Sequence, residues 1–177
     1  VMQRLRALFA KLRLTINEDK SAVASAFSRK FLGYSFFVDQ EGQVKKRVST
    51  KARESLKAKI RKLTRRKGGV KFEATAQKLR RLLHGWKAYF KRAQTPSTFQ
   101  KLDSWIRRRL RAMLFKQWKT AKKTYRALRR MGASHANAAR LTKERRRTWR
   151  TSLRANLAIK TDLFDKQRIP RLAPAPQ

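Results

Sequence analysis

The chain has 177 residues, of which 41% are hydrophobic, so it is long enough to bury the core of one domain or of two small ones. Its 49 lysines and arginines stand against 10 acidic residues, which gives a formal net charge of +39. This composition excludes a disordered basic tail, whose apolar content would be too low, and it indicates a polyanionic partner, above all a nucleic acid.

Cysteine is absent, which excludes disulfides and cysteine-based zinc sites and leaves the redox compartment open. No apolar run approaches the roughly 18 residues that span a bilayer. Because the charge is spread along the whole chain rather than held on one amphipathic helix, we expect no membrane partner. The first residues lack the apolar core and cleavage site of a signal peptide. They begin inside a helical pattern, so we take the chain to be a piece of a longer protein.

The N-terminal part reads as a helix followed by strands. A helical pattern over residues 2–13 ends where residues 14–16 alternate as a strand would. Residues 30–38 form the strongest strand of the sequence, rich in aromatic side chains. A turn over residues 39–42 leads into a more polar strand over 43–48, so the sequence predicts a β-hairpin.

Three helices are expected next, over about 50–66, 73–92 and 97–119. Ser49 and Thr50 offer a cap for the first, and Thr95 with Pro96 marks the start of the third. Narrow apolar stripes and short connections favour a small antiparallel bundle. Gly85, inside the second helix, costs about 1 kcal/mol relative to alanine, which close helix packing or an approaching RNA backbone would offset.

The second and third helices each carry one apolar stripe, with Trp86 and Phe90 at the centre of the first stripe. In the third, Leu102, Ile106 and Leu110 hold the bundle together, and the arginines fall on the opposite side or on the flanks. After residue 119 the pattern weakens into short helices, a basic run around Trp149 and a proline-rich end.

Two stretches resemble the reverse transcriptases encoded by group II introns. Leu14, Ile16 and Lys20, followed by residues 31–36, are similar to the last conserved block of the palm. The second stretch is similar to the thumb, or maturase-specific domain X, and consists of Leu83, Gly85, Trp86, Tyr89, Phe90, Phe99, Leu102, Asp103, Trp105, Ile106, Arg107, Arg108, Arg109, Leu110 and Arg111.

The resemblance implies a mostly α fold. A short N-terminal helix and β-hairpin would end the palm (1–48), a small antiparallel helical bundle would form the thumb (49–120), and a basic helical extension would follow (121–177). We expect residues 170–177 to be disordered.

The sequence offers little for catalysis. The family is an RNA-directed DNA polymerase, but the 10 acids are scattered and no paired aspartates of the polymerase type are present. His84 and His135 show no metal-ligand spacing, and the part after Gly132 lacks the pattern of the endonuclease that many relatives carry. Enzyme activity is therefore left open, and this chain alone should be inactive. We expect no metal or other cofactor here, with Mg²⁺ belonging to a polymerase domain N-terminal to residue 1.

Binding is the expected activity. Lysine and arginine neutralise phosphates, and aromatic side chains among them can stack unpaired bases, for which Trp105 and Trp118 are the candidates. The predicted RNA-binding residues are Lys20, Arg29, Lys30, Arg80, Arg81, Lys87, Lys91, Arg92, Trp105, Arg107, Arg108, Arg109, Arg111, Lys116, Trp118, Lys119, Arg145, Arg146 and Arg147.

The function that we expect is binding of structured group II intron RNA to assist splicing and, with a polymerase domain, a grip on the template–primer duplex. One alternative is a reverse-transcriptase thumb without a maturase role of its own. Another is a general basic RNA-binding protein of the ribosomal kind, which explains the charge but not the motifs. We expect the bacterial cytoplasm, with an organelle as the alternative. The sequence does not define the oligomeric state or which intron is bound.

Overall fold

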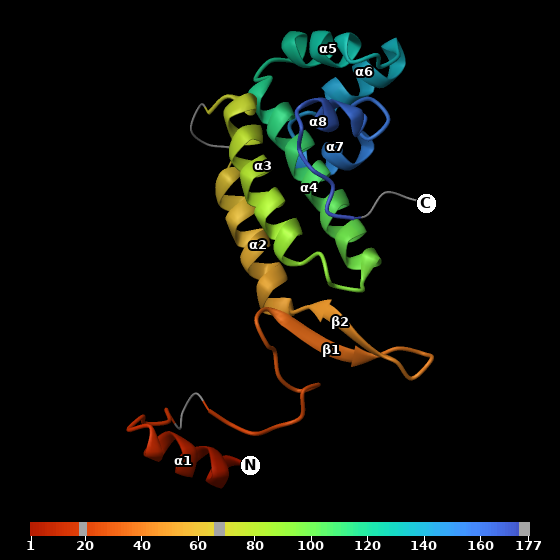
Figure 1. Cartoon of the computed structure of the whole chain (residues 1–177). Coiled ribbons are helices and arrows are strands. Elements are labelled where there is room, and N and C mark those ends of the chain that lie inside the picture. Colours follow the sequence, from red (N-terminus) through yellow and green to blue (C-terminus); the bar gives the residue numbers. More distant parts are fainter. Residues whose placement is uncertain (18–20, 66–69, 174–177) are drawn as a thin grey trace.

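A computed structural model describes residues 1–17, 21–65 and 70–173 of the chain (Figure 1). Within these residues, helices dominate and a single β-hairpin lies near the N-terminal end. The elements in chain order are α1 (Met2–Lys11), β1 (Tyr34–Val38), β2 (Val44–Val48), α2 (Thr50–Leu63), α3 (Phe72–Tyr89), α4 (Pro96–Gln117), α5 (Ala121–Arg130), α6 (His135–Lys143), α7 (Thr148–Arg154) and α8 (Asp162–Lys166).

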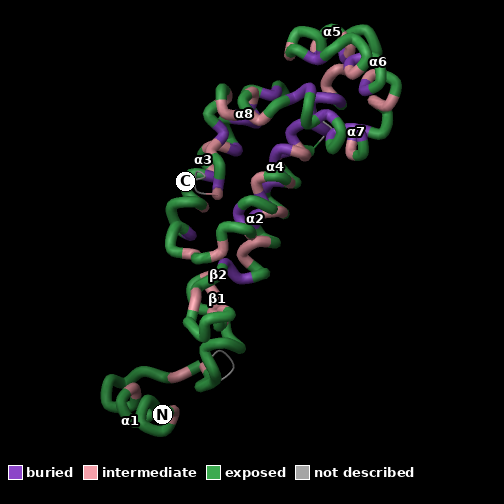
Figure 2. The backbone as a smooth tube through the Cα atoms, turned by 90° about the vertical axis from the view of Figure 1, so that its right-hand side faces the viewer, coloured by how far each residue is buried: buried purple, intermediate pink, exposed green. Residues whose placement is uncertain are grey.

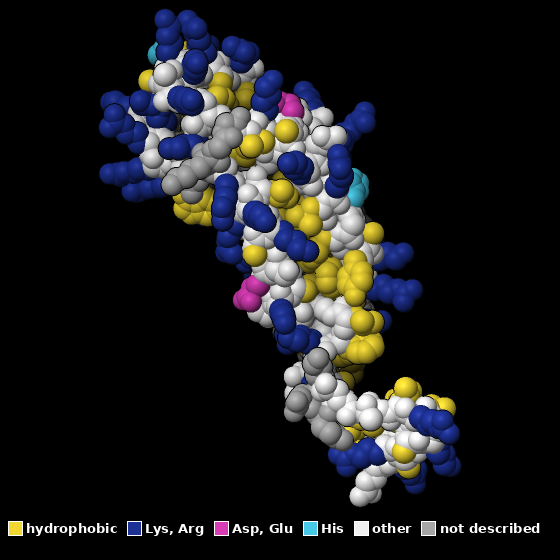
Figure 3. Space-filling model, turned by 90° about the vertical axis from the view of Figure 1, so that its left-hand side faces the viewer, with side chains coloured by type: hydrophobic (Ala, Val, Ile, Leu, Met, Phe, Trp, Pro, Cys, Tyr) yellow, Lys and Arg dark blue, Asp and Glu magenta, His cyan; other side chains and the backbone are white. Residues whose placement is uncertain are grey.

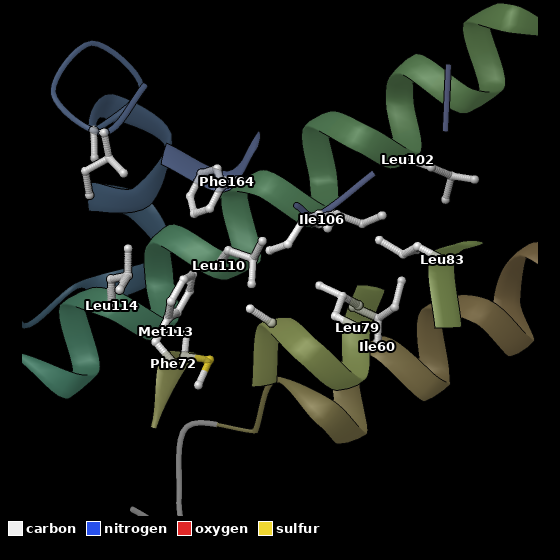
Figure 4. Packing of buried hydrophobic residues seen from close by; sticks show 14 of the residues in the cluster. Ile60, Phe72, Leu79, Leu83, Leu102, Ile106, Leu110, Met113, Leu114 and Phe164 are labelled. Carbon is white, nitrogen blue, oxygen red and sulfur yellow. The ribbon is translucent and has the colours of Figure 1, made fainter. Parts of the chain in front are cut away.

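The expected bundle is formed by α2, α3 and α4. Ile60 of α2, Leu79 of α3 and Ile106 of α4 are fully buried and point toward one another (Figure 4). Each such side chain contributes roughly 1.5–3 kcal/mol when it leaves water. The three-and-four spacing of the apolar residues therefore predicts the correct faces of all three helices, and the mostly helical fold is confirmed.

The predicted hairpin is also confirmed, with β1 and β2 antiparallel and Tyr34 opposite Val48. At its turn the Asp39 carboxylate accepts hydrogen bonds from the backbone N–H groups of Glu41 and Gln43, and Gly42 adopts a positive φ of 76°. These contacts fix the turn, because an aspartate that accepts from nearby backbone N–H groups closes a local ring and glycine adopts positive φ without strain.

Aromatic packing joins the hairpin to the bundle. The Tyr34 ring lies 5.2 Å from that of Phe90, centroid to centroid, and its hydroxyl donates to the Tyr89 carbonyl. Gly33, at φ +80°, brings its backbone so close to Phe90 that an added Cβ would lie 3.1 Å from Cζ. A side chain at Gly33 would therefore meet both backbone strain and a packed ring. Phe90 is buried and Trp86 packs against the core, as expected.

The segment before the hairpin differs from the prediction. Residues 14–16 form no strand, and Leu14 is exposed. α1 contains no buried residue, and it lies away from the bundle (Figures 1 and 2). Leu14 and Ile16 alternate as they would in a strand. Among the described residues, however, no strand lies beside them with which they could pair.

Two local predictions in the bundle are corrected. Thr95 stands at the N-cap of α4 with Pro96 in the first turn, but its side chain makes no capping hydrogen bond. Ser49 does cap α2, because its hydroxyl accepts from the Ala52 N–H. Gly85 is exposed, and an added Cβ would meet no atom within 4 Å, so close helix packing does not explain this glycine. The expected end of the first bundle helix at Gly68 and Gly69 lies outside the described residues.

The C-terminal part folds onto α4. Phe164 of α8, Ile169 and Leu172 are buried in the same hydrophobic cluster as Ile106. α7 and α8 lie beside α4, while α5 and α6 form a helical pair at its far end (Figure 1). The prediction of disorder is wrong for residues 170–173, because Leu172 fills this cluster. Residues 174–177 lie outside the described part.

Candidate nucleic-acid interface

Positive side chains cover the face that Figure 3 shows, with few acidic ones between them. Four of the eight acids in the described part of the chain form salt bridges or hydrogen bonds with other groups of the chain. Asp39 pairs with Lys45, Glu144 with Arg154, and Asp165 with both Arg107 and Arg171. Asp103 accepts from the backbone N–H groups of Leu172 and Ala173. Because the chain has 49 lysines and arginines against 10 acids, and four of these acids already contact other groups of the chain, the positive charge of the outer surface is left largely uncompensated.

The expected exposure of Arg107 and Arg111 is wrong, since these side chains are only 4% and 5% exposed. Arg107 Nη2 donates to the Ile169 carbonyl at 3.1 Å, and Arg111 Nε donates to the Ile159 carbonyl at 2.8 Å. Both guanidinium groups lie 5.7 Å from the Phe164 ring centroid. The C-terminal segment covers a side of α4 that looks free in the sequence, because the weak pattern after residue 119 gives no sign of where it packs.

Burial shifts the acid–base equilibria of these two arginines. Loss of solvent lowers the pKa of Arg107, and the carboxylates of Asp103 and Asp165 act against that shift. Loss of solvent, together with the nearby charge of Arg107, lowers the pKa of Arg111 to about 10. Both side chains remain charged at neutral pH. They serve as internal donors to backbone carbonyls and are not available to phosphates.

Arg108 and Arg109 are partly buried on either side of α4. The Arg108 guanidinium lies 4.0 Å from the Trp149 ring centroid and donates to the Trp149 carbonyl. Arg109 Nε donates to Thr64 Oγ1 of the segment after α2 at 2.8 Å. Both side chains thus have partners within the protein. The contact between Arg108 and Trp149 also places the basic run around Trp149 beside the middle of α4.

The two proposed stacking residues are both partly buried. Cations of three side chains lie over the Trp105 ring: those of Lys57, Arg61 and Arg109, at 5.8, 5.6 and 5.4 Å from its centroid. Trp118 packs edge-on against Phe115, with centroids 5.4 Å apart. In this structure Trp105 therefore forms cation–π contacts with three side chains, which the spacing of apolar residues in the sequence does not reveal.

The remaining predicted residues fall into separate groups. Lys87, Lys91 and Arg92 lie at the hairpin end of the bundle, whereas Lys116 and Lys119 lie at the opposite end of α4. The exposed members are Arg29, Lys30, Arg81, Lys87, Lys91, Arg92, Lys116, Lys119, Arg146 and Arg147, the partly buried ones are Arg80 and Arg145, and Lys20 lies outside the described residues. The structure therefore spreads these cations over the molecule rather than gathering them at one point.

Sequence reasoning missed several cations that the fold places beside predicted ones. Lys116 and Lys119 share a cavity of about 560 Å³ with Arg65 and Lys71. A second cavity, of about 570 Å³, brings Arg109 together with residues of α2. The helical periodicity of α2 shows that its lysines and arginines are exposed, but only tertiary packing shows which face α4.

Two kinds of feature are absent from the described residues. No group of three or more histidine, aspartate or glutamate side chains is placed to hold a metal ion there. None of the described helices is both long and apolar enough to cross a membrane.

The fold and surface thus define a cationic helical bundle with a β-hairpin at one end. Residues 53–132, from α2 through α5 to Gly132, match the model of the group II intron, maturase-specific domain family. This match confirms the resemblance of the second stretch to the maturase-specific domain and supports a group II intron maturase role in splicing, and it does not extend to the stretch that resembles the palm. None of the curated proteins compared with the chain matches it.

Proposed function

We propose that this protein binds the folded RNA of a group II intron and stabilises it for splicing. The observation that carries the proposal is the largely uncompensated positive surface on a maturase-specific fold. With only 10 acids in the chain against 49 lysines and arginines, little on the surface offsets the positive charge. A polyanion would relieve the repulsion between them.

The physical basis of binding is counterion release. Each lysine or arginine that neutralises a phosphate frees a condensed cation, so affinity falls steeply as salt rises. Exposed side chains such as Arg81, Lys91, Lys116 and Arg146 are the proposed contacts. Arg107 and Arg111 are not, because they are buried against the C-terminal segment. The helical bundle holds the exposed cations at fixed separations, which favours one folded RNA shape over others.

We propose further that, joined to a polymerase domain, the same surface grips a template–primer duplex. This role uses phosphates of a regular helix, which every duplex offers. Preference for a folded intron therefore separates a maturase from a thumb that serves a polymerase alone, and from a general basic RNA-binding protein.

The test is the affinity for a folded group II intron RNA against an unrelated structured RNA of equal length, at physiological salt. A preference of about a hundredfold, or about 2.7 kcal/mol, is the expected result for recognition of intron architecture. Equal affinities that fall together with salt would reject the proposed maturase role and leave a non-specific electrostatic grip.

A further inference from the structure

Among the described residues, the cavity between α2 and α4 is lined by several cations and by no acidic side chain. Its lining residues are Ala58, Arg61, Lys62, Thr64, Arg65 and Arg109, and none of these is acidic. Lys57 lies beside it, over the same Trp105 ring as Arg61 and Arg109. The cavity, about 570 Å³ in volume, is open to solvent along the exposed face of α2.

The cations of this cluster repel one another. Two unit charges a few ångströms apart interact by about 1 kcal/mol in water and by more where solvent is partly excluded. Among the described residues, Lys57, Arg61 and Lys62 form no salt bridge with any acid. A cation–π contact with Trp105 returns only about 0.5–1 kcal/mol at an exposed site. The arrangement therefore favours binding of an anion from outside the chain.

The other side of α4 provides an internal comparison. There Arg107 Nη2 donates to the Ile169 carbonyl and Arg111 Nε donates to the Ile159 carbonyl, and Asp165 pairs with Arg107. On the α2 side no acid lines the cavity, and Glu54, one turn before Ala58 in α2, forms no salt bridge with any described residue. The same helix thus places Arg107 and Arg111 against the C-terminal segment and Arg109 beside a cavity that opens to solvent.

The donor set of the cavity selects the chemical class of the ligand. Arginine and lysine side chains are hydrogen-bond donors only. The one acceptor side chain, the Thr64 hydroxyl, is only 1% exposed, accepts from Arg109 Nε and donates to the Ile60 carbonyl at 2.6 Å. The Watson–Crick edge of a base presents donors as well as acceptors, and those donors would find no partner here. The O6/N7 edge of guanine presents acceptors alone, but it carries no negative charge to offset the cations. A phosphate presents acceptors only, so it fits every available group.

We propose that the α2–α4 cavity binds a phosphodiester of the RNA backbone, with Arg109 as its fixed donor and Arg61, Lys62 and Arg65 closing around the phosphate. The Thr64 hydrogen bond holds the Arg109 guanidinium in place before the ligand arrives. Trp105 supports the cations from behind and does not stack a base. This proposal rests on the proposed binding of RNA and specifies one site within it.

The test compares two double variants of the full chain that remove the same charge from the same helix. Arg61→Gln with Lys62→Gln alters the cavity, whereas Lys51→Gln with Lys59→Gln alters exposed positions of α2 that do not line it. We expect the cavity variant to bind folded intron RNA about tenfold or more weakly, and the slope of log affinity against log salt to fall by about 1. The control variant should change affinity less than about threefold, as a general effect of charge would.

A second measurement replaces single phosphates of the RNA by uncharged methylphosphonates. At the linkage that enters the cavity, the replacement should weaken RNA binding by the wild-type protein and by the control variant. It should weaken binding by the cavity variant little further, because that variant has already lost the contact. Equal losses for cavity and control variants, or additive effects at every linkage, would overturn the proposal. The cavity and control variants can also be compared on an unrelated structured RNA. A lack of preference for the intron would therefore reject the maturase role but would not reject the phosphate site. Unchanged thermal unfolding of both variants confirms that folding is not the cause.

Discussion

At the scale of single residues, burial separates arginines that look alike in sequence. Arg107, Arg108, Arg109 and Arg111 share one helix, yet two of them are buried donors to the C-terminal segment. Because a charged donor contributes about 1.5–3 kcal/mol per hydrogen bond, such a side chain can hold a segment in place despite the cost of its burial. A dense run of arginines is therefore not in itself a map of RNA contacts.

Replacing Arg111 by alanine should destabilise the protein. The change removes hydrogen bonds to the Ile159 carbonyl and to Asn156 Oδ1. It also relieves the burial of the charge and its repulsion by Arg107, which lower the pKa of Arg111 to about 10 and so cost on the order of 3 kcal/mol, at about 1.4 kcal/mol per pKa unit. With the lost side-chain packing included, we expect a net loss of about 2 kcal/mol in the free energy of unfolding.

Thermal unfolding measures this loss, which should lower the melting temperature by about 4–8 °C. Lys116→Ala on the same helix is the matched control, because Lys116 is exposed and should alter the stability by no more than about 0.5 kcal/mol. Equal melting temperatures for Arg111→Ala and the wild type would show that this side chain does not hold the C-terminal segment.

At the scale of elements, α4 is the centre of the molecule. Its α2 and α3 side buries Leu102, Ile106 and Leu110, and another side is covered by α7, α8 and the last described residues (Figure 4). Asp103 fixes those residues, since its carboxylate accepts from the Leu172 and Ala173 N–H groups at 2.9–3.0 Å. A single acid thus anchors the end of the described chain to the start of α4.

Asp103→Ala should release this end without unfolding the bundle. The Leu172 and Ala173 N–H groups would lose their partner, and hydrogen exchange over residues 169–173 should accelerate, together with tryptic cleavage after Arg171. Asp162→Ala removes an equal charge from an exposed position of α8 and should leave both rates unchanged. Protection of the segment in the Asp103 variant would mean that the buried Leu172 side chain suffices to hold it.

At the scale of the whole molecule, the sequence predicts elements better than their contacts. The hairpin and the three long helices can be predicted because their apolar residues recur at strand or helix spacing. The faces that bear Leu83, Phe90 and Ile106, for example, are apolar and are therefore expected to be buried. The C-terminal packing could not be predicted in this way. Its helices are short and its apolar residues, such as Ile159 and Phe164, show no long period. The cavity beside Trp105 likewise depends on how α2 meets α4, which no local pattern encodes.

The distribution of buried residues predicts which parts of the chain the fold requires. Residues 1–28 contribute no buried side chain among those described, whereas the region after residue 143 contributes Ile159, Phe164, Ile169 and Leu172 to the common core. The matched family segment ends at residue 132, before those residues, so that segment alone lacks part of its hydrophobic cover. A chain without residues 1–28 should keep the cooperative unfolding transition of the full protein.

A chain that ends at residue 143 should lose that transition and expose apolar surface. Four fully buried apolar side chains together contribute roughly 6–12 kcal/mol, which is comparable to the whole stability of a domain. Removing them would also leave Arg107 and Arg111 without their carbonyl partners. Circular dichroism during heating, with binding of a hydrophobic dye, measures both effects. A sharp transition near the wild-type temperature in the shortened chain would show that the bundle of α2, α3 and α4 is complete without the C-terminal cover.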